Sequence, residues 1–209
     1  MVIDSSVKQL FNIPKSLIDN FSSICDTVDW SAQELIRNDP LGSRTIRIPF
    51  GYRKDPEYEL TEQIQRVQNH FFEEMNPWLK KKFSNRIFFK GEINYIFPST
   101  VLLFHVDSAW FHEFSSRIHI PILTNDQTFW ATSTELIHLP VGYVYEVNNR
   151  ELHSYWNKGG TGRLHIVIDV MDQDIYNGAV SRKIDFNQLT TDTMPTSPEK
   201  IFNQNKWQL

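Results

Sequence analysis

The chain has 209 residues, a formal charge of −4 at pH 7, 40% hydrophobic residues and 22% charged residues. These values are typical of one soluble globular domain with a buried core, and the acidic balance disfavours a nucleic-acid partner. No apolar run is long enough to span a bilayer, and the amino terminus lacks the layout of a signal peptide. The single cysteine, Cys25, excludes an internal disulfide and favours a reducing compartment, so we expect a cytoplasmic protein.

Helical periods dominate residues 1–88. Apolar residues recur every three or four positions in two stretches, which predicts one helix over Pro14–Cys25 and a longer one over Asp55–Phe83. Asp55 is the expected N-cap of the longer helix, because Pro56 then occupies the first helical position. Pro77 is the expected break in that helix. The apolar stripes predict that these helices pack against a flat surface.

Short β-rich runs separated by turn-forming residues occupy residues 89–172. The expected strands are Ile93–Phe97, Val101–Val106, Arg117–Leu123, Thr128–Thr132, Glu135–Leu139, Tyr143–Val147, Leu152–Trp156 and Leu164–Val170. Short strands at this spacing predict a mainly β fold, either a β-sandwich or a jelly roll. We expect a single domain over residues 1–178, followed by a polar C-terminal extension over residues 179–209.

Three residues of the strand-like region have the side chains of a metal site. His105 and Asp107 stand two positions apart in one expected strand, so they share a face, and His153 comes from a later strand. Two histidines and one carboxylate are the ligand set that holds Fe(II) in non-haem oxygenases. The His-x-Asp pair alone is a weak signal, because strand histidines are more often surface or core residues. The metal interpretation depends on the combination with His153 and with the arginines that follow.

Arg163 opens the last expected strand, and a residue of this type can pin the far carboxylate of a keto acid. On an earlier strand, Arg117 and His119 share the face opposite three isoleucines. A buried cation is costly unless an anion meets it, so we expect Arg117 and His119 to contact a keto-acid carboxylate, a substrate carboxylate or one of each. An exposed polar face is the alternative. His165, on the face of Arg163, is a weaker candidate for a pocket wall.

Together these residues resemble the aspartyl/asparaginyl β-hydroxylase family, which includes bacterial cis-proline hydroxylases. The resemblance covers somewhat under half the chain, from Ile93 to Val170, and its order and spacing are more specific than any single piece. The matching residues are Pro98, His105-Val106-Asp107, Arg117-Ile118-His119-Ile120-Pro121, Gly142, His153 and Arg163-Leu164-His165-Ile166-Val167-Ile168-Asp169-Val170.

The resemblance implies a double-stranded β-helix (a cupin-like jelly roll) with the N-terminal helices packed on one sheet. It implies that His105, Asp107 and His153 bind Fe(II), that Arg163 binds the distal carboxylate of 2-oxoglutarate, and that His119 lies near the proximal one. Such a catalytic domain would use O2 to hydroxylate an unactivated C–H bond, with release of succinate and CO2. The animal aspartyl hydroxylases of this family have glycine at the position of Asp107, so this chain is nearer to the proline-hydroxylase-like members.

Two other classes stay open. A non-enzymatic jelly roll, acting as a metal-binding sensor or binding module, leaves Asp107 and Arg163 without a purpose. A cupin-type metal enzyme that does not use 2-oxoglutarate leaves Arg163 and His119 without one. The substrate of a hydroxylase could be a free amino acid, a peptidyl Asp, Asn or Pro-like side chain, or another small metabolite. The sequence gives neither the regiochemistry nor the oligomeric state.

Overall fold

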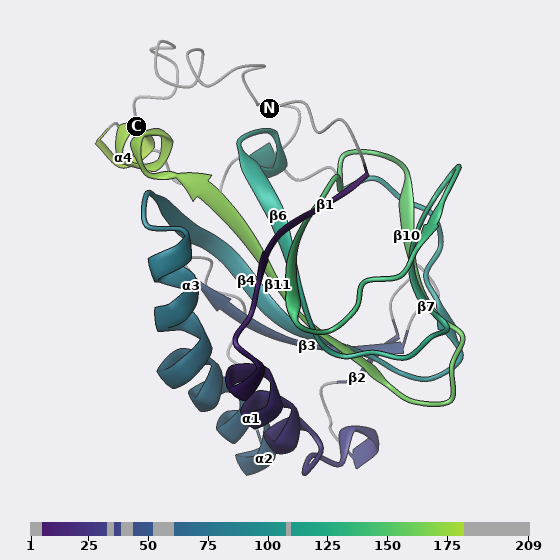
Figure 1. Cartoon of the computed structure of the whole chain (residues 1–209). Helices are drawn as coiled ribbons and strands as arrows, with labels where there is room; N and C mark the ends of the chain where they lie inside the picture. The colour runs from purple at the N-terminus through teal and green to yellow at the C-terminus, as the bar shows by residue number, and fades with distance from the viewer. Residues whose placement is uncertain (1–5, 33–35, 39–43, 52–60, 108–109, 182–209) are drawn as a thin grey trace.

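Two antiparallel sheets face each other in this computed structural model, which describes residues 6–32, 36–38, 44–51, 61–107 and 110–181 (Figure 1). The major sheet has the strand order β1-β9-β6-β11-β4-β3-β2 and the minor sheet has the order β5-β10-β7-β8. The major-sheet strands are β1 (Val7–Asn12), β2 (Ile36–Asn38), β3 (Arg44–Gly51), β4 (Arg86–Ile96), β6 (Ser115–Leu123), β9 (Tyr143–Val147) and β11 (Arg163–Asp172). Those of the minor sheet are β5 (Thr100–Val101), β7 (Thr128–Thr132), β8 (Leu136–Ile137) and β10 (His153–Asn157).

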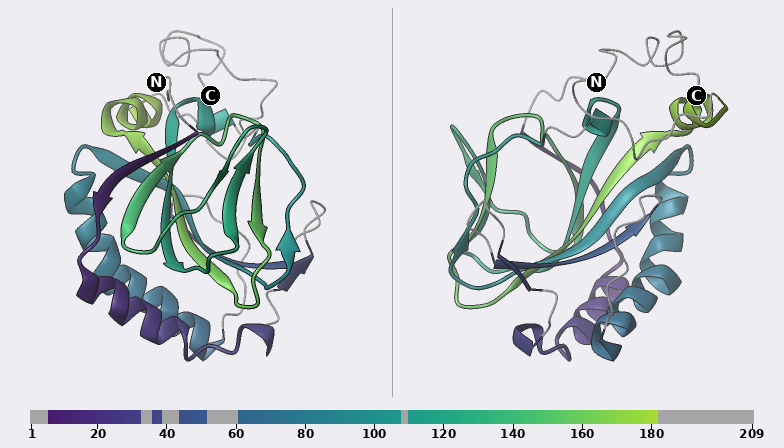
Figure 2. Two further views of the ribbon diagram at one scale, coloured as in Figure 1. Left: turned by 45° about the vertical axis from the view of Figure 1, so that its right-hand side comes forward. Right: turned by 180° about the vertical axis from the view of Figure 1, so that it is seen from behind.

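The eight strands from β4 to β11 pass back and forth between the sheets, except that β7 and β8 are neighbours in the minor sheet, which is the topology of a double-stranded β-helix. The first strand, β4, pairs with the last, β11, and β11 pairs with β6. In the minor sheet, β10 pairs with β5 on one side and β7 on the other. The predicted jelly roll is therefore confirmed, and Figure 2 shows the two sheets curving around a shared interior.

The predicted strands differ in how well their bounds were placed. Thr128–Thr132 and Tyr143–Val147 have the predicted bounds, because clean alternation and turn residues delimit them. The run Val101–Val106 is wrong as a continuous strand: pairing stops after Val101 and resumes only at one bridge between His105 and His153. This break leaves the His-x-Asp segment as an irregular rim beside β10.

The N-terminal part contains the two predicted helical stretches, but it is not purely helical. α1 (Lys15–Cys25) begins after Pro14, as expected. The second stretch begins later than predicted, after Thr61, whose side chain accepts a hydrogen bond from the Ile64 amide. The expected cap Asp55 lies outside the described residues. Strands β1, β2 and β3 were missed: β2 has only three residues and a bulge interrupts the alternation of β1, whereas β3 is neither short nor bulged and was overlooked.

Pro77 does not break the second helical stretch. α2 (Glu62–His70) passes through a π-helical turn (Phe71–Met75) into α3 (Asn76–Lys82), and Pro77 lies in the first turn of α3. Proline has no amide hydrogen, but a residue in the first turn of a helix needs none for helical hydrogen bonding. Pro77 therefore fits after the π turn, and the helical path continues. A further helix, α4 (Gln173–Ser181), follows β11 directly, and the remainder of the predicted C-terminal extension lies outside the described residues.

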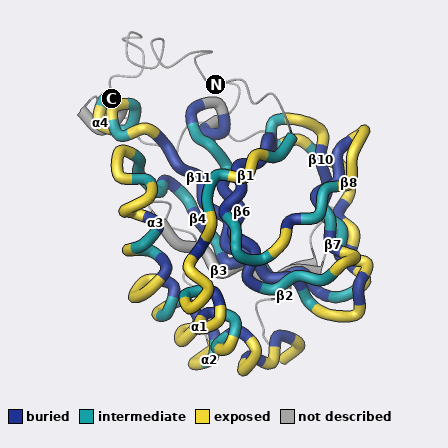
Figure 3. The backbone as a smooth tube through the Cα atoms, in the orientation of Figure 1, coloured by how far each residue is buried: buried dark blue, intermediate teal, exposed yellow. Residues whose placement is uncertain are grey.

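The helices cover the outer face of the major sheet, as predicted. One cluster joins their apolar stripes to alternate residues of the sheet: Phe21, Ile64, Val67, Phe71, Met75, Leu79, Ile93, Ile118, Ile120, Ile122, Leu164, Ile166, Ile168 and Val170. Figure 3 shows the strands of the major sheet buried between these helices and the minor sheet. Burying each such side chain contributes about 1.5–3 kcal/mol, which makes this the main stabilising layer. In the part of the chain that the structure describes, no helix has the length and apolarity to cross a membrane.

Candidate metal centre

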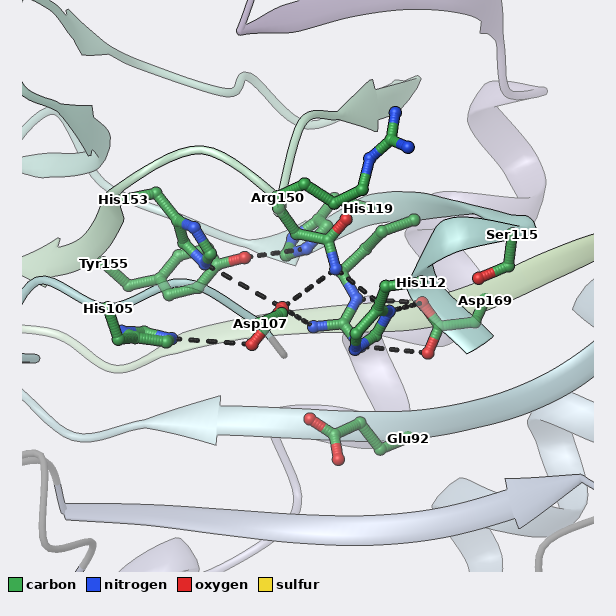
Figure 4. A network of polar contacts seen from close by, with 12 residues as sticks. Glu92, His105, Asp107, His112, Ser115, His119, Arg150, His153, Tyr155 and Asp169 are labelled. Carbon is green, nitrogen blue, oxygen red and sulfur yellow. Dashed lines mark hydrogen bonds and ion pairs between the residues drawn. The ribbon is translucent and has the colours of Figure 1, made fainter. Parts of the chain in front are cut away.

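The structure brings the side chains of His105, Asp107 and His153 together at one end of the barrel interior. One nitrogen or oxygen from each residue lies within 4.8 Å of the others. The His105 Nε2 atom is 3.7 Å from Asp107 Oδ1, and the His153 Nε2 atom is 3.9 Å from Asp107 Oδ2 (Figure 4). The bridge between His105 and His153, with amide hydrogen bonds of 2.9 Å in both directions, holds the two histidines opposite each other.

Backbone contacts fix which imidazole nitrogen of each histidine faces the centre. His105 Nδ1 donates to the Leu103 carbonyl at 2.9 Å, and His153 Nδ1 donates to the Glu151 carbonyl at 2.8 Å. With the proton on Nδ1, each Nε2 presents a lone pair toward Asp107. A backbone carbonyl on the second nitrogen is the usual way in which proteins orient a metal-ligating histidine.

His153 supplies the observation that tests whether a metal fits here. Its side chain is fully buried, yet its Nε2 atom has no hydrogen-bond partner among the described residues. Its ring stacks on Trp130 with centroids 4.4 Å apart and an interplanar angle of 7°. Burial lowers the pKa of His153 to about 4, so the ring is neutral at pH 7. A buried, neutral, unpartnered nitrogen aimed at a carboxylate fits a metal ligand.

Asp107 is held by a network that orients one of its oxygens. Oδ2 accepts hydrogen bonds from Arg117 Nη1 and, at 3.0 Å, from Asn149 Nδ2. The Asp107 amide donates to the Asn149 carbonyl at 3.0 Å. Burial alone would raise the pKa of Asp107, but the adjacent Arg117 and the Asn149 bond outweigh it and lower the pKa to about 2. Asp107 is therefore an anion at neutral pH, with Oδ1 on the side of His105.

Arg117 finds its anions within the chain. Its Nε and Nη2 atoms donate to the two oxygens of Asp169 at 2.9 Å each, while Nη1 reaches Asp107. Burial would lower the pKa of Arg117, but these two carboxylates raise it. The sequence predicted that Arg117 would bind a carboxylate of a ligand, but in the structure Arg117 binds the carboxylates of Asp107 and Asp169. A role for Arg117 in binding a keto acid stays a prediction, whereas its contact with the candidate ligand Asp107 is a feature of the structure.

Arg163, by contrast, has no carboxylate partner among the described residues. It is 3% exposed; its Nη2 atom donates to His165 Nδ1 at 2.6 Å, and its guanidinium lies 4.9 Å from the Tyr155 ring centroid. Burial lowers its pKa to about 10, so it remains charged at pH 7. A buried guanidinium satisfied only by neutral groups is a site for an anion from outside the chain.

Glycine before Arg163 is required by packing. A Cβ at Gly162 would collide with the hydroxyl of Tyr95, so a larger residue would push the start of β11 away from β4. Asn157 holds the preceding turn, because its Nδ2 atom donates to the Ile96, Phe97 and Thr161 carbonyls. The position of Arg163 is therefore set by rigid contacts on both sides of the turn.

A chain of hydrogen bonds links Arg163 to the minor sheet. His165 Nδ1 accepts from Arg163, and it also lies 3.4 Å from His119 Nδ1, which therefore carries a proton. His119 Nε2 then accepts from the Tyr155 hydroxyl at 2.9 Å. Burial and the nearby arginines lower the pKa of both histidines well below the usual range. His119 is thus neutral and lies in the interior between His165 and Tyr155, whereas its place near the proximal carboxylate of 2-oxoglutarate stays a prediction.

Three residues of this network were missed in the sequence: Asn149, His112 and Asp169. Asn149 Nδ2 donates to His112 Nδ1 at 3.1 Å as well as to Asp107. One signal could have revealed Asp169: it is the single acid in the apolar run Leu164–Val170, on the face of His165, so it needed a buried cation. Asn149 and His112 lie in loop and turn segments, where alternation carries no information.

No protein-family model matches the sequence, and no curated protein matches it. Among solved structures, the chain is similar to a viral collagen prolyl hydroxylase from Paramecium bursaria Chlorella virus-1 in a 2OG complex, with 10% identity, TM-score 0.46, and coverage of 81% of this chain and 97% of that one. A Pseudomonas putida prolyl-4-hydroxylase has 12% identity, TM-score 0.47, and coverage of 81% and 94%. A 2OG-Fe(II) oxygenase family oxidoreductase from Burkholderia pseudomallei has 12% identity, TM-score 0.42, and coverage of 78% and 95%. Because these identities and TM-scores are low, a functional assignment depends on the geometry of the site.

Proposed function

We propose that this chain is an Fe(II)- and 2-oxoglutarate-dependent dioxygenase that hydroxylates an unactivated C–H bond of an amino acid or a peptidyl side chain. One observation carries the proposal. The His105–Asp107–His153 cluster and the buried Arg163, which has no carboxylate partner among the described residues, line the same barrel interior. Hydrogen bonds run from Arg163 through His165 and His119 to Tyr155, whose ring centroid lies 5.8 Å from that of His153. Many classes of enzyme have a metal ligand set of this kind. A metal site together with a buried arginine that has no carboxylate partner fits a co-substrate that chelates the metal at one end and has a carboxylate at the other.

The residues divide the work of binding. His105, Asp107 and His153 would hold Fe(II) on one side and leave the other side to co-substrate and O2. Arg163 would receive the distal carboxylate of 2-oxoglutarate, and His119 would lie near the end that chelates the metal. The chemistry that bound Fe(II) supplies with 2-oxoglutarate and O2 is C–H hydroxylation, with release of succinate and CO2.

Other side chains exclude water and fix protons around the site. Trp130 covers one face of the His153 ring, and His119 stacks on Tyr155 with centroids 5.4 Å apart. Burial raises the pKa of Tyr155, so its hydroxyl keeps the proton that it donates to His119. A dry, neutral wall around Arg163 strengthens its attraction for a carboxylate, because the local dielectric is low.

The finer assignments are part of the same proposal. The motif resemblance favours members of the aspartyl/asparaginyl β-hydroxylase family that resemble cis-proline hydroxylases, and Asp107 completes their ligand set. A cytoplasmic location is supported by the single cysteine, Cys25, which cannot form an internal disulfide. The partner would be a small amino acid or a peptide; neither a nucleic acid nor a membrane is needed.

The test is succinate formation from 2-oxoglutarate by Fe(II)-loaded protein with ascorbate and O2. We expect slow turnover even without a prime substrate, and its loss in His153→Ala. His138→Ala, which removes a histidine outside the triad, is the matched control and should retain the turnover. If the loaded protein makes no succinate, or if His153→Ala makes as much as the wild type, the proposal is wrong.

The same experiment separates the two alternatives. A cupin-type enzyme without 2-oxoglutarate would bind metal through the triad but make no succinate. A non-enzymatic sensor would bind metal and show no metal-dependent affinity for the keto acid. In both cases Arg163→Ala would leave the binding of 2-oxoglutarate unchanged, whereas the dioxygenase proposal requires that it weaken.

A further inference from the structure

Glu92 lies on the interior face of the major sheet, among the groups of the proposed site. Its neighbours on β4, Ile93 and Tyr95, belong to the core on the outer face, so Glu92 points inward. In register, Glu92 is opposite Val167 on β11, and Val167 is opposite His119 on β6. The row across the sheet therefore runs from Glu92 past one aliphatic residue to His119. Figure 4 shows the Glu92 side chain on the side of the site where His105 and Asp107 lie.

Glu92 has no cationic partner among the residues whose side chains the structure describes. It is half-buried, and its one hydrogen bond is accepted from Asn94 Nδ2 at 3.0 Å. No lysine or arginine among the described residues forms an ion pair with it. A carboxylate that faces a protein interior with a single neutral donor retains most of its capacity to accept hydrogen bonds.

Asn94 provides an independent observation at the same place. Its Oδ1 atom is buried and has no hydrogen-bond partner. The bond to Glu92 fixes the orientation of the Asn94 amide, because the flipped amide would place Oδ1 against the carboxylate, so the orphaned atom is the acceptor Oδ1. Two neighbouring inward side chains thus offer acceptors and lack donors. A ligand rich in N–H groups would satisfy both.

Among the described residues, no interior cation forms an ion pair with Glu92. Arg117 is held by Asp107 and Asp169, and Lys90 directs its ammonium over the Phe111 ring at 5.9 Å. Arg163 pairs with Ile96 in register, four residues along β4 from Glu92, which is about 13 Å at strand spacing. No ion pair joins the side chains of Glu92 and Arg163 in the structure.

We propose that Glu92, with Asn94, binds a protonated amine or guanidinium of the substrate, so that the substrate is a basic amino acid or a basic side chain. The inference rests on the proposed function and adds the substrate class to it. An ammonium offers three donors and a guanidinium five, enough for the Glu92 carboxylate and Asn94 Oδ1 together. An acidic substrate would meet Glu92 with a like charge and no free arginine to offset it.

The experiment compares matched compounds with Fe(II)-loaded protein, 2-oxoglutarate, ascorbate and O2. The pairs are arginine with citrulline and lysine with norleucine, each free and at the centre of a capped tripeptide, with glutamate as the acidic compound. Mass spectrometry detects a product heavier by one oxygen atom. We expect product from at least one basic compound and at least about tenfold less from its neutral isostere, because a desolvated carboxylate left unpaired is costly.

Glu92→Gln tests the residue itself. It should lower kcat/KM for the basic compound at least about tenfold while leaving 2-oxoglutarate binding to Mn(II)-loaded protein unchanged. Glu73→Gln, an exposed glutamate of the helical layer on the other side of the sheet, is the matched control and should behave as the wild type.

Each failure has its own meaning. Succinate formation with no product from any basic compound, equal product from the neutral isosteres, or an unaffected Glu92→Gln enzyme would overturn this inference and leave the proposed function standing. Absence of both succinate and keto-acid binding would overturn the proposed function and the inference with it.

Discussion

The two faces of the major sheet are made by the same strands and have opposite character. On the outer face, Ile118 and Ile166 pack with the helices in a core without charges. On the inner face, one residue along, Arg117, His165 and Asp169 bury two charges and a neutral imidazole. Because side chains alternate along a strand, β6 and β11 serve both purposes without a boundary between them. Stability and binding are therefore separable residue by residue, and each prediction below tests that separation.

The largest effect is expected at Asp107. Asp107→Ala removes the one anionic member of the triad, so the affinity for Mn(II), measured by calorimetric titration, should fall on the order of 100-fold or more. The fold should survive, because Arg117 keeps its bidentate pairing with Asp169. Unchanged Mn(II) affinity in a folded variant would show that the ion binds elsewhere.

Ile166→Ala probes the outer face of the same strand that carries His165. Ile166 is fully buried, and its truncation should lower the free energy of unfolding by about 2–5 kcal/mol in urea denaturation. The Mn(II) affinity of the folded protein should stay within about twofold of the wild type. A large loss of metal affinity in the folded variant would mean that the two faces are coupled.

Asp169→Asn probes the inner face behind the ligands. The substitution weakens the ion pair that orients Arg117, and Arg117 in turn donates a hydrogen bond to Asp107. The affinity for Mn(II) should therefore fall by about 10–100-fold, with little change in the binding of the keto acid by Arg163. Arg117→Lys should act in the same direction, because an ammonium cannot bridge both carboxylates in this geometry. If 2-oxoglutarate affinity falls and Mn(II) affinity does not, Arg117 acts on the keto acid, as the sequence predicted.

The smallest effect concerns pH. Burial lowers the pKa of His119 and His165 well below that of an unfolded histidine, about 6.5, so the unfolded chain binds more protons below that pH. The free energy of unfolding of metal-free protein should be flat above pH 6.5. Below it, stability should decline by up to about 1.4 kcal/mol per pH unit for each such histidine. In His165→Gln the decline between pH 6.5 and 5.5 should be shallower; an identical slope would contradict the assignment.

The sequence predicted the structure best where the residue types present are compatible with few alternative roles. The triad could be grouped in advance because His105, Asp107 and His153 combine two separate strand positions with a ligand set that has a specific chemistry. The outer core was also predictable, since isoleucines alternate cleanly along β6 and β11. In these segments local pattern and tertiary packing agree.

The sequence was least informative where a contact joins distant segments. The Arg117–Asp169 and Asn149–Asp107 bonds join residues 52 and 42 positions apart, and no local pattern encodes either. The contacts of Arg117 therefore depend on the tertiary fold, and so does the absence of an ion pair at Glu92 among the described residues. Strand β2 escaped prediction because three residues are too few to show alternation, whereas Ile46, Ile48 and Phe50 of β3 do alternate and could have revealed that strand.

Binding of 2-oxoglutarate to Mn(II)-loaded protein, followed by calorimetry, tests the central claim most directly. Wild-type protein should bind 2-oxoglutarate only when the metal is present, and Arg163→Ala should weaken that binding at least about tenfold, because its buried guanidinium is the free anion site of the interior. Arg163→Lys should recover part of the affinity. Binding that is independent of the metal, or equal in Arg163→Ala and wild type, would contradict the account.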